Sequence, residues 1–236
     1  MTRAEQIAAG LAEVRARVAA AEKAAGRPAG AVRLLAVSKK MSADDVRAAA
    51  AAGQRAFGEN YAQELRDKRA ELASDATPPE WHYIGPLQSN KVKYVAGQVA
   101  LLHTIDSLAL LEAVEARGAA QVCLVQVNVA GEAQKRGVAP AELPALLDRF
   151  AAAAHVRCAG LMVIPPLTEN PEDARPHFAA LRALRDLEAA RPRANVDLRE
   201  LSMGMSGDLE IAVAEGATIV RVGTAIFGRR AVTREA

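Results

Sequence analysis

Short apolar runs alternate with longer amphipathic stretches along most of the chain. After Arg33, residues 34–37 are apolar without interruption, and Ser38, Lys39 and Lys40 follow directly. So short an apolar run predicts a β-strand that is buried on both faces. Similar runs predict further strands over residues 55–60, 81–85, 100–106, 121–129, 156–166, 198–206 and 217–228.

The stretches between these runs carry apolar residues three and four positions apart, which predicts amphipathic helices. One additional helix precedes the first strand, where Ile7, Leu11, Val14 and Val18 form a single apolar stripe, and it ends near Gly26. The helices predicted after the strands cover residues 42–53, 61–72, 89–96, 107–118, 140–154, a long stretch around 178–187, and 208–216.

Eight strands that are nearly all followed by a helix, with one extra helix in front, are the element count of a (β/α)8 TIM barrel. The 236 residues fit that fold, and no glycine-, serine- or proline-rich linker divides the chain. We therefore predict a single-domain α/β barrel over residues 1–236, with an N-terminal helix in 1–27 and the barrel in 33–228. A doubly wound open sheet is the alternative, but it carries glycines after its first strand, and none follows here.

The composition narrows the function classes. A net charge of +2 is too balanced for a nucleic-acid-binding surface, and we interpret the basic tail at 228–236 as a frayed end. No apolar run approaches the roughly 20 residues of a membrane span, and the charged N-terminus lacks the apolar centre of a signal peptide. Cys123 and Cys158 lie in apolar runs, so we expect buried thiols in a reducing compartment, the cytoplasm, and no metal site.

Polar residues cluster where the predicted strands end. In a TIM barrel the carboxyl ends of all strands share one face, and binding sites are built there. Arg221 is the most informative of these residues, because it lies between two valines and a charge at that place must point toward a partner in the barrel mouth. The strand-end residues that we single out are Lys39, Asn60, His82, Asp106, Asn128, Met203, Ser206 and Arg221.

Two glycine-bearing turns follow the last two predicted strands, in SMGMSGD (202–208) and RVGTAIFG (221–228). Backbone N–H groups and the hydroxyls of Ser206 and Thr224 are typical there of a phosphate site after strands seven and eight of a barrel. A lysine after strand one together with a phosphate site indicates an imine to a phosphorylated aldehyde. Pyridoxal 5'-phosphate fits that description, and so does a sugar phosphate in a class I aldolase.

Six motifs occur in order along the chain: AVSKK, FGENYAQE, WHYIGPLQSNK, HTIDS, LSMGMSGDLE and VRVGTAIFG. Through them the chain resembles the pyridoxal phosphate homeostasis protein family over essentially its whole length. That family is itself similar to the barrel domain of alanine racemase, of fold type III among pyridoxal phosphate enzymes. The resemblance implies pyridoxal phosphate binding and a role in vitamin B6 homeostasis, without enzymatic turnover.

The resemblance also implies roles for individual residues. Lys39 would form the aldimine with pyridoxal phosphate, and Arg221 would face the pyridine nitrogen. Lys40 departs from the family pattern; strand alternation places it on the opposite face from Lys39, so we assign the aldimine to Lys39. The implied cofactor-binding residues are Lys39, Asn60, His82 (beside the ring), Met203, Arg221, and Ser206, Gly223 and Thr224 (at the phosphate), with no catalytic residue.

Arg221 also bears on the function. Pyridoxal phosphate is the strongest electron sink when its ring nitrogen is protonated opposite a carboxylate, and an arginine cannot accept that proton. Such a site suits a carrier or buffer of B6 vitamers that serves pyridoxal-phosphate-requiring apo-enzymes, and it also suits a racemase, which tolerates the weaker sink. An amino-acid racemase is the alternative, and it needs a second acid/base group, typically a tyrosine from another domain. We expect a monomer with no membrane and no nucleic-acid partner.

Overall fold

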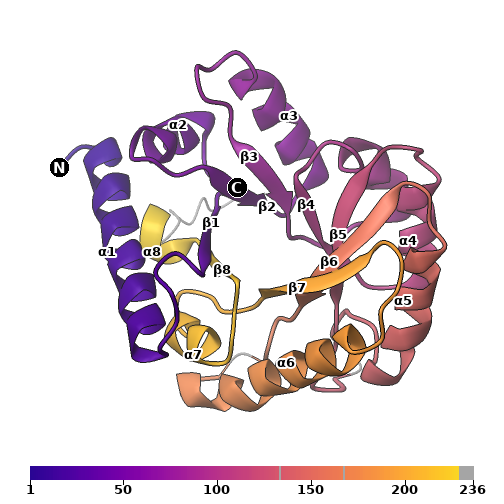
Figure 1. The fold of residues 1–236 in the computed structure, drawn as a ribbon. Helices are drawn as coiled ribbons and strands as arrows, with labels where there is room; N and C mark the ends of the chain where they lie inside the picture. The colour runs from indigo at the N-terminus through magenta and orange to yellow at the C-terminus, as the bar shows by residue number, and fades with distance from the viewer. Residues whose placement is uncertain (133, 167, 229–236) are drawn as a thin grey trace.

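The apolar runs lie side by side as parallel strands in sequence order, and the last strand returns to the first. Because β8 pairs in parallel with β1, the sheet closes into a barrel that helices surround (Figure 1). The computed structural model describes residues 1–132, 134–166 and 168–228, so the basic tail from residue 229 onward lies outside the described part. Within it, no helix is long and apolar enough to cross a membrane. The predicted TIM barrel with an additional N-terminal helix is confirmed.

The strands of the barrel are β1 (Arg33–Val37), β2 (Ala56–Glu59), β3 (Glu80–Tyr83), β4 (Leu101–Ile105), β5 (Gln121–Gln126), β6 (Val156–Met162), β7 (Val196–Ser202) and β8 (Ile219–Val222). The α-helices of the described residues are α1 (Arg3–Ala24), α2 (Ala43–Ala51), α3 (Ala62–Leu72), α4 (Leu108–Glu115), α5 (Leu143–Ala151), α6 (Arg175–Ala189), α7 (Leu209–Ala214) and α8 (Thr224–Phe227). The 3-10 helices are η1 (Ser89–Tyr94), η2 (Pro140–Glu142) and η3 (Pro171–Ala174).

Alternation along each strand separates inward from outward side chains. In β8, Val220 and Val222 are fully buried in the outer apolar layer between strands and helices, whereas Arg221 points into the barrel. Leu35 of β1 lies opposite Arg221 and belongs to the inner apolar cluster. This register brings the turn after β1, which contains Lys39, next to the turn after β8.

Helix α1 covers the outside of the barrel near the junction of β8 and β1. Its predicted apolar stripe is confirmed, since Ile7 and Leu11 are fully buried, and the helix packs against α2, α7 and α8 (Figure 1). The approach is closest at Gly10, where a Cβ atom would lie 2.7 Å from the carbonyl oxygen of Ala225 and 2.8 Å from that of Ile226. Glycine at this position therefore sets the distance between α1 and α8.

The prediction of a strand over residues 217–228 is wrong in its second half, because β8 ends at Val222. Strand pairing between β8 and β1 ends at Ala36 and Val222. The chain turns instead into the short helix Thr224–Phe227, whose last two residues are buried.

Further elements differ from the prediction. The helix predicted over residues 89–96 is only the 3-10 segment η1, in which Val92 is the buried residue, and Gly97 reverses the chain with a φ of +71°. The strands predicted over 156–166 and 198–206 end earlier, at Met162 and Ser202. Their remaining residues form turns at the barrel mouth.

Replacing Gly10 with alanine tests the close contact between α1 and α8. The new methyl group would collide with two backbone carbonyl oxygens, so α1 must shift away from the barrel, although alanine by itself favours a helix by about 1 kcal/mol. We expect the free energy of unfolding from urea titration to fall by about 1–3 kcal/mol. An unchanged or higher stability would contradict the contact.

Candidate functional site

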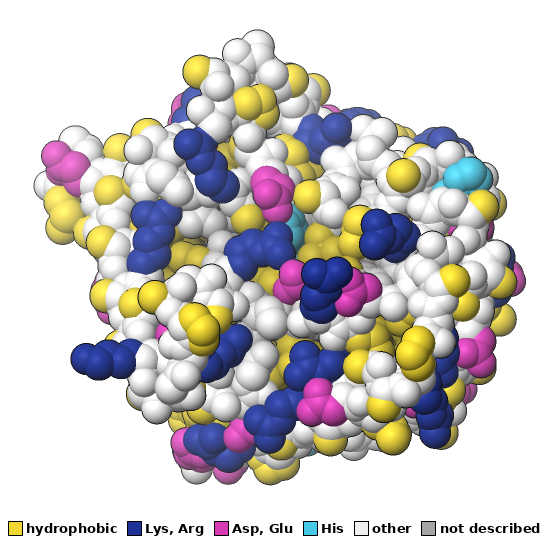
Figure 2. Space-filling model, in the orientation of Figure 1, with side chains coloured by type: hydrophobic (Ala, Val, Ile, Leu, Met, Phe, Trp, Pro, Cys, Tyr) yellow, Lys and Arg dark blue, Asp and Glu magenta, His cyan; other side chains and the backbone are white. Residues whose placement is uncertain are grey.

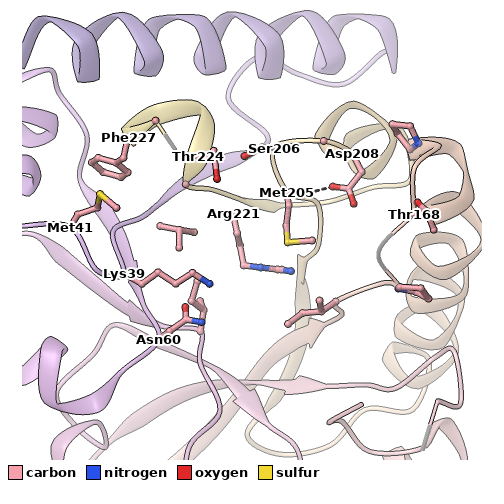
Figure 3. Close-up of a pocket in the computed structure, with 18 of the residues that line it drawn as sticks. Lys39, Met41, Asn60, Thr168, Met205, Ser206, Asp208, Arg221, Thr224 and Phe227 are labelled. Atoms are coloured by element: carbon pink, nitrogen blue, oxygen red, sulfur yellow. Dashed lines mark hydrogen bonds between the residues drawn. The ribbon is translucent and has the colours of Figure 1, made fainter. Parts of the chain in front are cut away.

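A cavity of about 450 Å³ opens at the carboxyl ends of the strands (Figure 3). Its walls come from the ends of β1, β2, β3 and β8 and from the turns that follow β6, β7 and β8. Of the cofactor-binding residues implied by the motifs, the cavity brings together Lys39, Asn60, Ser206, Arg221, Gly223 and Thr224.

Lys39 lies in a tight turn directly after β1. The N–H of Met41 donates a 2.9 Å hydrogen bond to the carbonyl oxygen of Ser38, and the Ser38 side chain is fully buried. The turn directs the Lys39 side chain into the middle of the cavity, toward Arg221 and beside Asn60 (Figure 3). An amine in this position can reach a ligand held anywhere across the cavity.

A buried ion pair beneath the turn holds it in place. The Lys68 ammonium group donates to the carbonyl oxygen of Ser38 at 2.7 Å and to the carboxylate of Glu59 at 2.8 Å. The Ser38 hydroxyl donates to the same carboxylate oxygen at 2.7 Å. Burial raises the pKa of Glu59, and the charge and hydrogen bond of Lys68 oppose that rise. Because Lys68 ties the backbone of the turn to β2, the position of Lys39 depends on this pair.

Lys40 takes a different direction from Lys39. Its backbone is left-handed, with a φ of +60°, and its N–H donates to the Glu64 carboxylate at 2.5 Å. Its ammonium group lies 5.9 Å from the centre of the Tyr61 ring, in a separate open groove. The two lysines diverge as predicted, but the cause differs: both lie in a turn beyond β1, so strand alternation does not apply to them.

Arg221 lies at the inner end of the cavity. One guanidinium nitrogen donates to Ser202 Oγ at 2.9 Å and the other to the carbonyl oxygen of Val163 at 2.9 Å. Burial lowers the pKa of Arg221 to about 10, and the carboxylate of Asp208 opposes the shift. The guanidinium is therefore charged at neutral pH, which favours an anionic or electron-rich ligand in front of it.

Hydroxyl groups and glycines form the corner of the cavity next to α7 and α8. Ser206 and Thr224 lie together on this side (Figure 3), and Gly207 and Gly223 adjoin them in the chain and also line the cavity. Hydroxyls and unobstructed backbone N–H groups are donors that phosphate oxygens accept. This corner therefore fits a phosphate group.

Asn60 brings an unsatisfied polar atom to the cavity. Its side-chain oxygen Oδ1 is buried and accepts no hydrogen bond from the described residues, whereas its carbonyl oxygen accepts one of 3.0 Å from the Tyr83 hydroxyl. Buried polar atoms normally have a partner. The side-chain amide, which can present its oxygen or its NH2 group, thus fits a polar group of a ligand beside Lys39.

Two residues of the implied set are not among the described residues that line the cavity. His82 is fully buried deeper in the barrel, and Ile84, two residues further along the chain, faces the cavity instead. Met203 is fully buried in the outer apolar layer. Alternation explains this orientation, since the preceding Ser202 points inward and Met203 must then point outward. The predicted placement of both residues at the barrel mouth is corrected accordingly.

The sequence analysis missed the cavity wall that the loop after β6 supplies. Ile164, Pro166, Thr168 and Glu169 line the cavity from this loop, and Met205 lines it from the turn after β7. The predicted fold could have indicated this wall, because every loop that follows a strand of a TIM barrel opens onto the same face.

The closed parallel barrel, with a lysine after its first strand and an arginine of its last strand in one cavity, defines an alanine-racemase-like barrel. A sequence profile described as "Alanine racemase, N-terminal domain" matches residues 9–231. The pyridoxal phosphate homeostasis protein of Pseudomonas aeruginosa is 47% identical over 230 residues, which cover 95% of this chain and 96% of that protein. The chain belongs to the pyridoxal phosphate homeostasis protein family, as its motifs indicated.

Solved structures agree with this assignment. PipY of Synechococcus elongatus, solved with PLP bound, is 39% identical and superimposes with a TM-score of 0.80 over 94% of this chain and 100% of PipY. Alanine racemase of Corynebacterium glutamicum superimposes with a TM-score of 0.69 over 99% of this chain and 63% of the racemase. At 18% identity, that second likeness shows the fold alone.

Replacing Lys68 with methionine tests the ion pair under the Lys39 turn. Removing one partner of a buried pair leaves an uncompensated charge on Glu59, so we expect a loss of about 3–5 kcal/mol in the free energy of unfolding at pH 8. A buried carboxyl whose folded-state pKa is raised favours folding as the pH falls through that pKa. Without Lys68 the pKa of Glu59 rises further, so the loss relative to wild type should be smaller at pH 5 than at pH 8.

Urea titrations of Lys68→Met at both pH values, with the exposed Lys40→Met as matched control, measure this effect. The double variant Glu59→Gln, Lys68→Met should recover part of the lost stability, because the fully buried charge of Glu59 is gone and only the partly exposed Glu64 is left without Lys68. A loss that is equal at both pH values would contradict the role of Glu59.

Proposed function

We propose that this protein holds pyridoxal 5'-phosphate (PLP) in the cavity at the barrel mouth and thereby takes part in vitamin B6 homeostasis. The observation that carries the proposal is the Lys39 side chain in one cavity with Arg221 and the hydroxyls of Ser206 and Thr224. PipY, a relative at 39% identity, was solved with PLP bound, which supports the same ligand here.

The proposed attachment is an imine between Lys39 and the PLP aldehyde. The unprotonated amine adds to the aldehyde carbon, water leaves, and a C=N bond then joins Nζ to that carbon. Ser206, Thr224 and the backbone at Gly223 would hold the phosphate, whose negative charge suits a cavity that contains a lysine and a buried arginine. The Asn60 amide would face a polar substituent of the ring.

Arg221 supports a holding function rather than turnover. Its guanidinium has only N–H donors, so it would donate to an unprotonated ring nitrogen and disfavour the pyridinium form. PLP supplies an electron sink for amino-acid chemistry when it is bound with a protonated ring. In this cavity the sink is weakened, which suits a carrier or buffer.

The tyrosines lie outside the cavity wall, which weighs against the racemase alternative. Tyr83 donates its hydroxyl to two carbonyl oxygens, and burial raises its pKa to about 12. Tyr61 lies under the Lys40 amine, and Tyr94 lies among basic side chains. None of the three lines the cavity of the described residues, where a racemase needs a second acid/base group opposite the lysine.

The proposed setting is the cytoplasm, where the protein would bind PLP and related B6 vitamers as a monomer and supply PLP-requiring apo-enzymes. Both cysteines of the chain, Cys123 and Cys158, are free thiols, and burial raises the pKa of each. Thiols of this kind are the usual state of cysteines in a reducing compartment.

Reduction with borohydride tests the attachment site. Protein purified with PLP should be yellow, and reduction should fix the cofactor on the peptide that contains Lys39. We expect Lys39→Ala to lose the colour and to bind PLP at least about tenfold more weakly, whereas Lys40→Ala should retain both properties. Mass spectrometry that places the cofactor on Lys40 would overturn the assignment.

Incubation with single amino-acid enantiomers tests the absence of turnover. The PLP-loaded protein should leave each enantiomer unchanged over hours, because the sink is weak and no tyrosine is among the described residues that line the cavity. Chiral chromatography measures the outcome. Steady interconversion above that of Lys39→Ala would establish the racemase instead, and a sugar phosphate that displaces the imine absorbance would favour an aldolase.

A further inference from the structure

A continuous chain of hydrogen-bonded side chains runs through the barrel interior from Arg221 to Glu80. Arg221 is 2.9 Å from Ser202 Oγ, and that oxygen is 2.9 Å from Nδ1 of His103. The other ring nitrogen of His103 is 2.8 Å from Nδ1 of His82, and Nε2 of His82 is 2.9 Å from the Glu80 carboxylate. Both histidines and Ser202 are fully buried, so water cannot substitute for any of these three residues.

The two ends of this chain determine the direction of every hydrogen bond in it. The Arg221 guanidinium can only donate, and an ionised Glu80 can only accept. The hydrogen bond from His82 and the charge of Arg33 hold the pKa of Glu80 below its usual value, so Glu80 is ionised at neutral pH. Ser202 therefore donates its single proton to His103, and both imidazoles carry their proton on Nε2.

Burial favours the neutral form of both histidines. Burial lowers the pKa of His103 well below its usual value, and the positive charges of Arg221 and Arg33 lower it further. Burial also lowers the pKa of His82, against the opposing influence of Glu80 and Glu200. With neutral rings, each imidazole has one donor and one acceptor, which is what an unbranched chain requires.

The hydrogen-bonded side chains from Arg221 to Glu80 connect the two ends of the barrel. Arg221 lines the cavity at the carboxyl ends of the strands, whereas Glu80 is the first residue of β3 and pairs with Arg33, the first residue of β1. The side chains of Arg33 and Glu80 are 43% and 45% exposed. Figure 2 shows basic and acidic side chains over the middle of one face, with a histidine visible between them. The terminal acceptor is thus open to solvent and can be changed without disturbing the core.

We propose that Ser202, His103, His82 and Glu80 are positioning residues that hold the Arg221 guanidinium toward the ring nitrogen of PLP. The assignment rests on the proposed function, because PLP supplies the atom that Arg221 faces. With its proton committed to His103, Ser202 offers its lone pairs to Arg221. If the chain ran in the opposite direction, His103 would donate to Ser202 as well, the serine proton would need another acceptor, and the hold on Arg221 would weaken.

The first test uses the cofactor-free protein and nitrogen NMR of its histidine rings. In wild type, both buried rings should show the neutral Nε2–H form at neutral pH and above. Glu80→Ala removes the acceptor, so both rings should change to a mixture of tautomers, whereas Glu80→Gln retains an oxygen acceptor and the wild-type form. His155→Gln, at an exposed histidine, is the control. Protonated rings or Nδ1–H forms in wild type, or unchanged rings in Glu80→Ala, would overturn the proposal.

The second test uses the PLP-loaded protein. Ser202→Ala should raise the dissociation constant of PLP about threefold to tenfold, the value of one buried hydrogen bond. Ser202→Ala should also shift the visible spectrum of the bound cofactor, and Glu80→Ala should shift it in the same direction. Wild-type affinity and spectrum in both variants would refute the positioning role while leaving PLP binding intact. Failure of the wild type to bind PLP would instead refute the proposed function. The NMR result would still show in which direction the hydrogen bonds between Arg221 and Glu80 run.

Discussion

Arg221 places a positive charge inside the barrel, and the inner end of the site is arranged around that charge. A guanidinium removed from water is costly unless hydrogen-bond acceptors surround it. Here the acceptors come from two neighbouring strands, as the carbonyl of Val163 follows β6 and Ser202 ends β7. The arginine therefore ties β6, β7 and β8 together at the cavity. Its remaining N–H groups are available to whatever ligand the cavity holds.

The second cation of the site is placed by different means. Lys39 belongs to no strand, and its direction depends on a turn whose carbonyl oxygen is held by Lys68 and whose next residue, Lys40, is left-handed. A buried ion pair of this kind contributes little net stability. It does favour a single arrangement, because another turn would remove the Ser38 carbonyl from the buried Lys68 and the Ser38 hydroxyl from the buried Glu59. The ion pair thus holds Lys39 in position while it contributes little to the free energy of unfolding of the barrel.

Much of the site could be predicted because chemistry in a TIM barrel collects at the carboxyl ends of the strands. Asn60, Ser206, Thr224 and Gly223 follow such ends, and their place in the chain was enough to bring them to the cavity. His82 failed the same reasoning, because its depth depends on how far β3 is staggered against its neighbours. Stagger is set by the closure of the whole sheet, and no local pattern records it.

The sequence by itself determined the order and type of the elements, the family, and the presence of a lysine after the first strand and an arginine within the last. These follow from the period of apolar residues and from short motifs, which act over a few residues. Tertiary structure alone decided that a turn, rather than strand alternation, separates the two adjacent lysines, that the loop after β6 forms a wall, and that Arg221 is joined to Glu80 through the core. Each of these depends on contacts between residues far apart in the chain, whose geometry exists only once the barrel has closed.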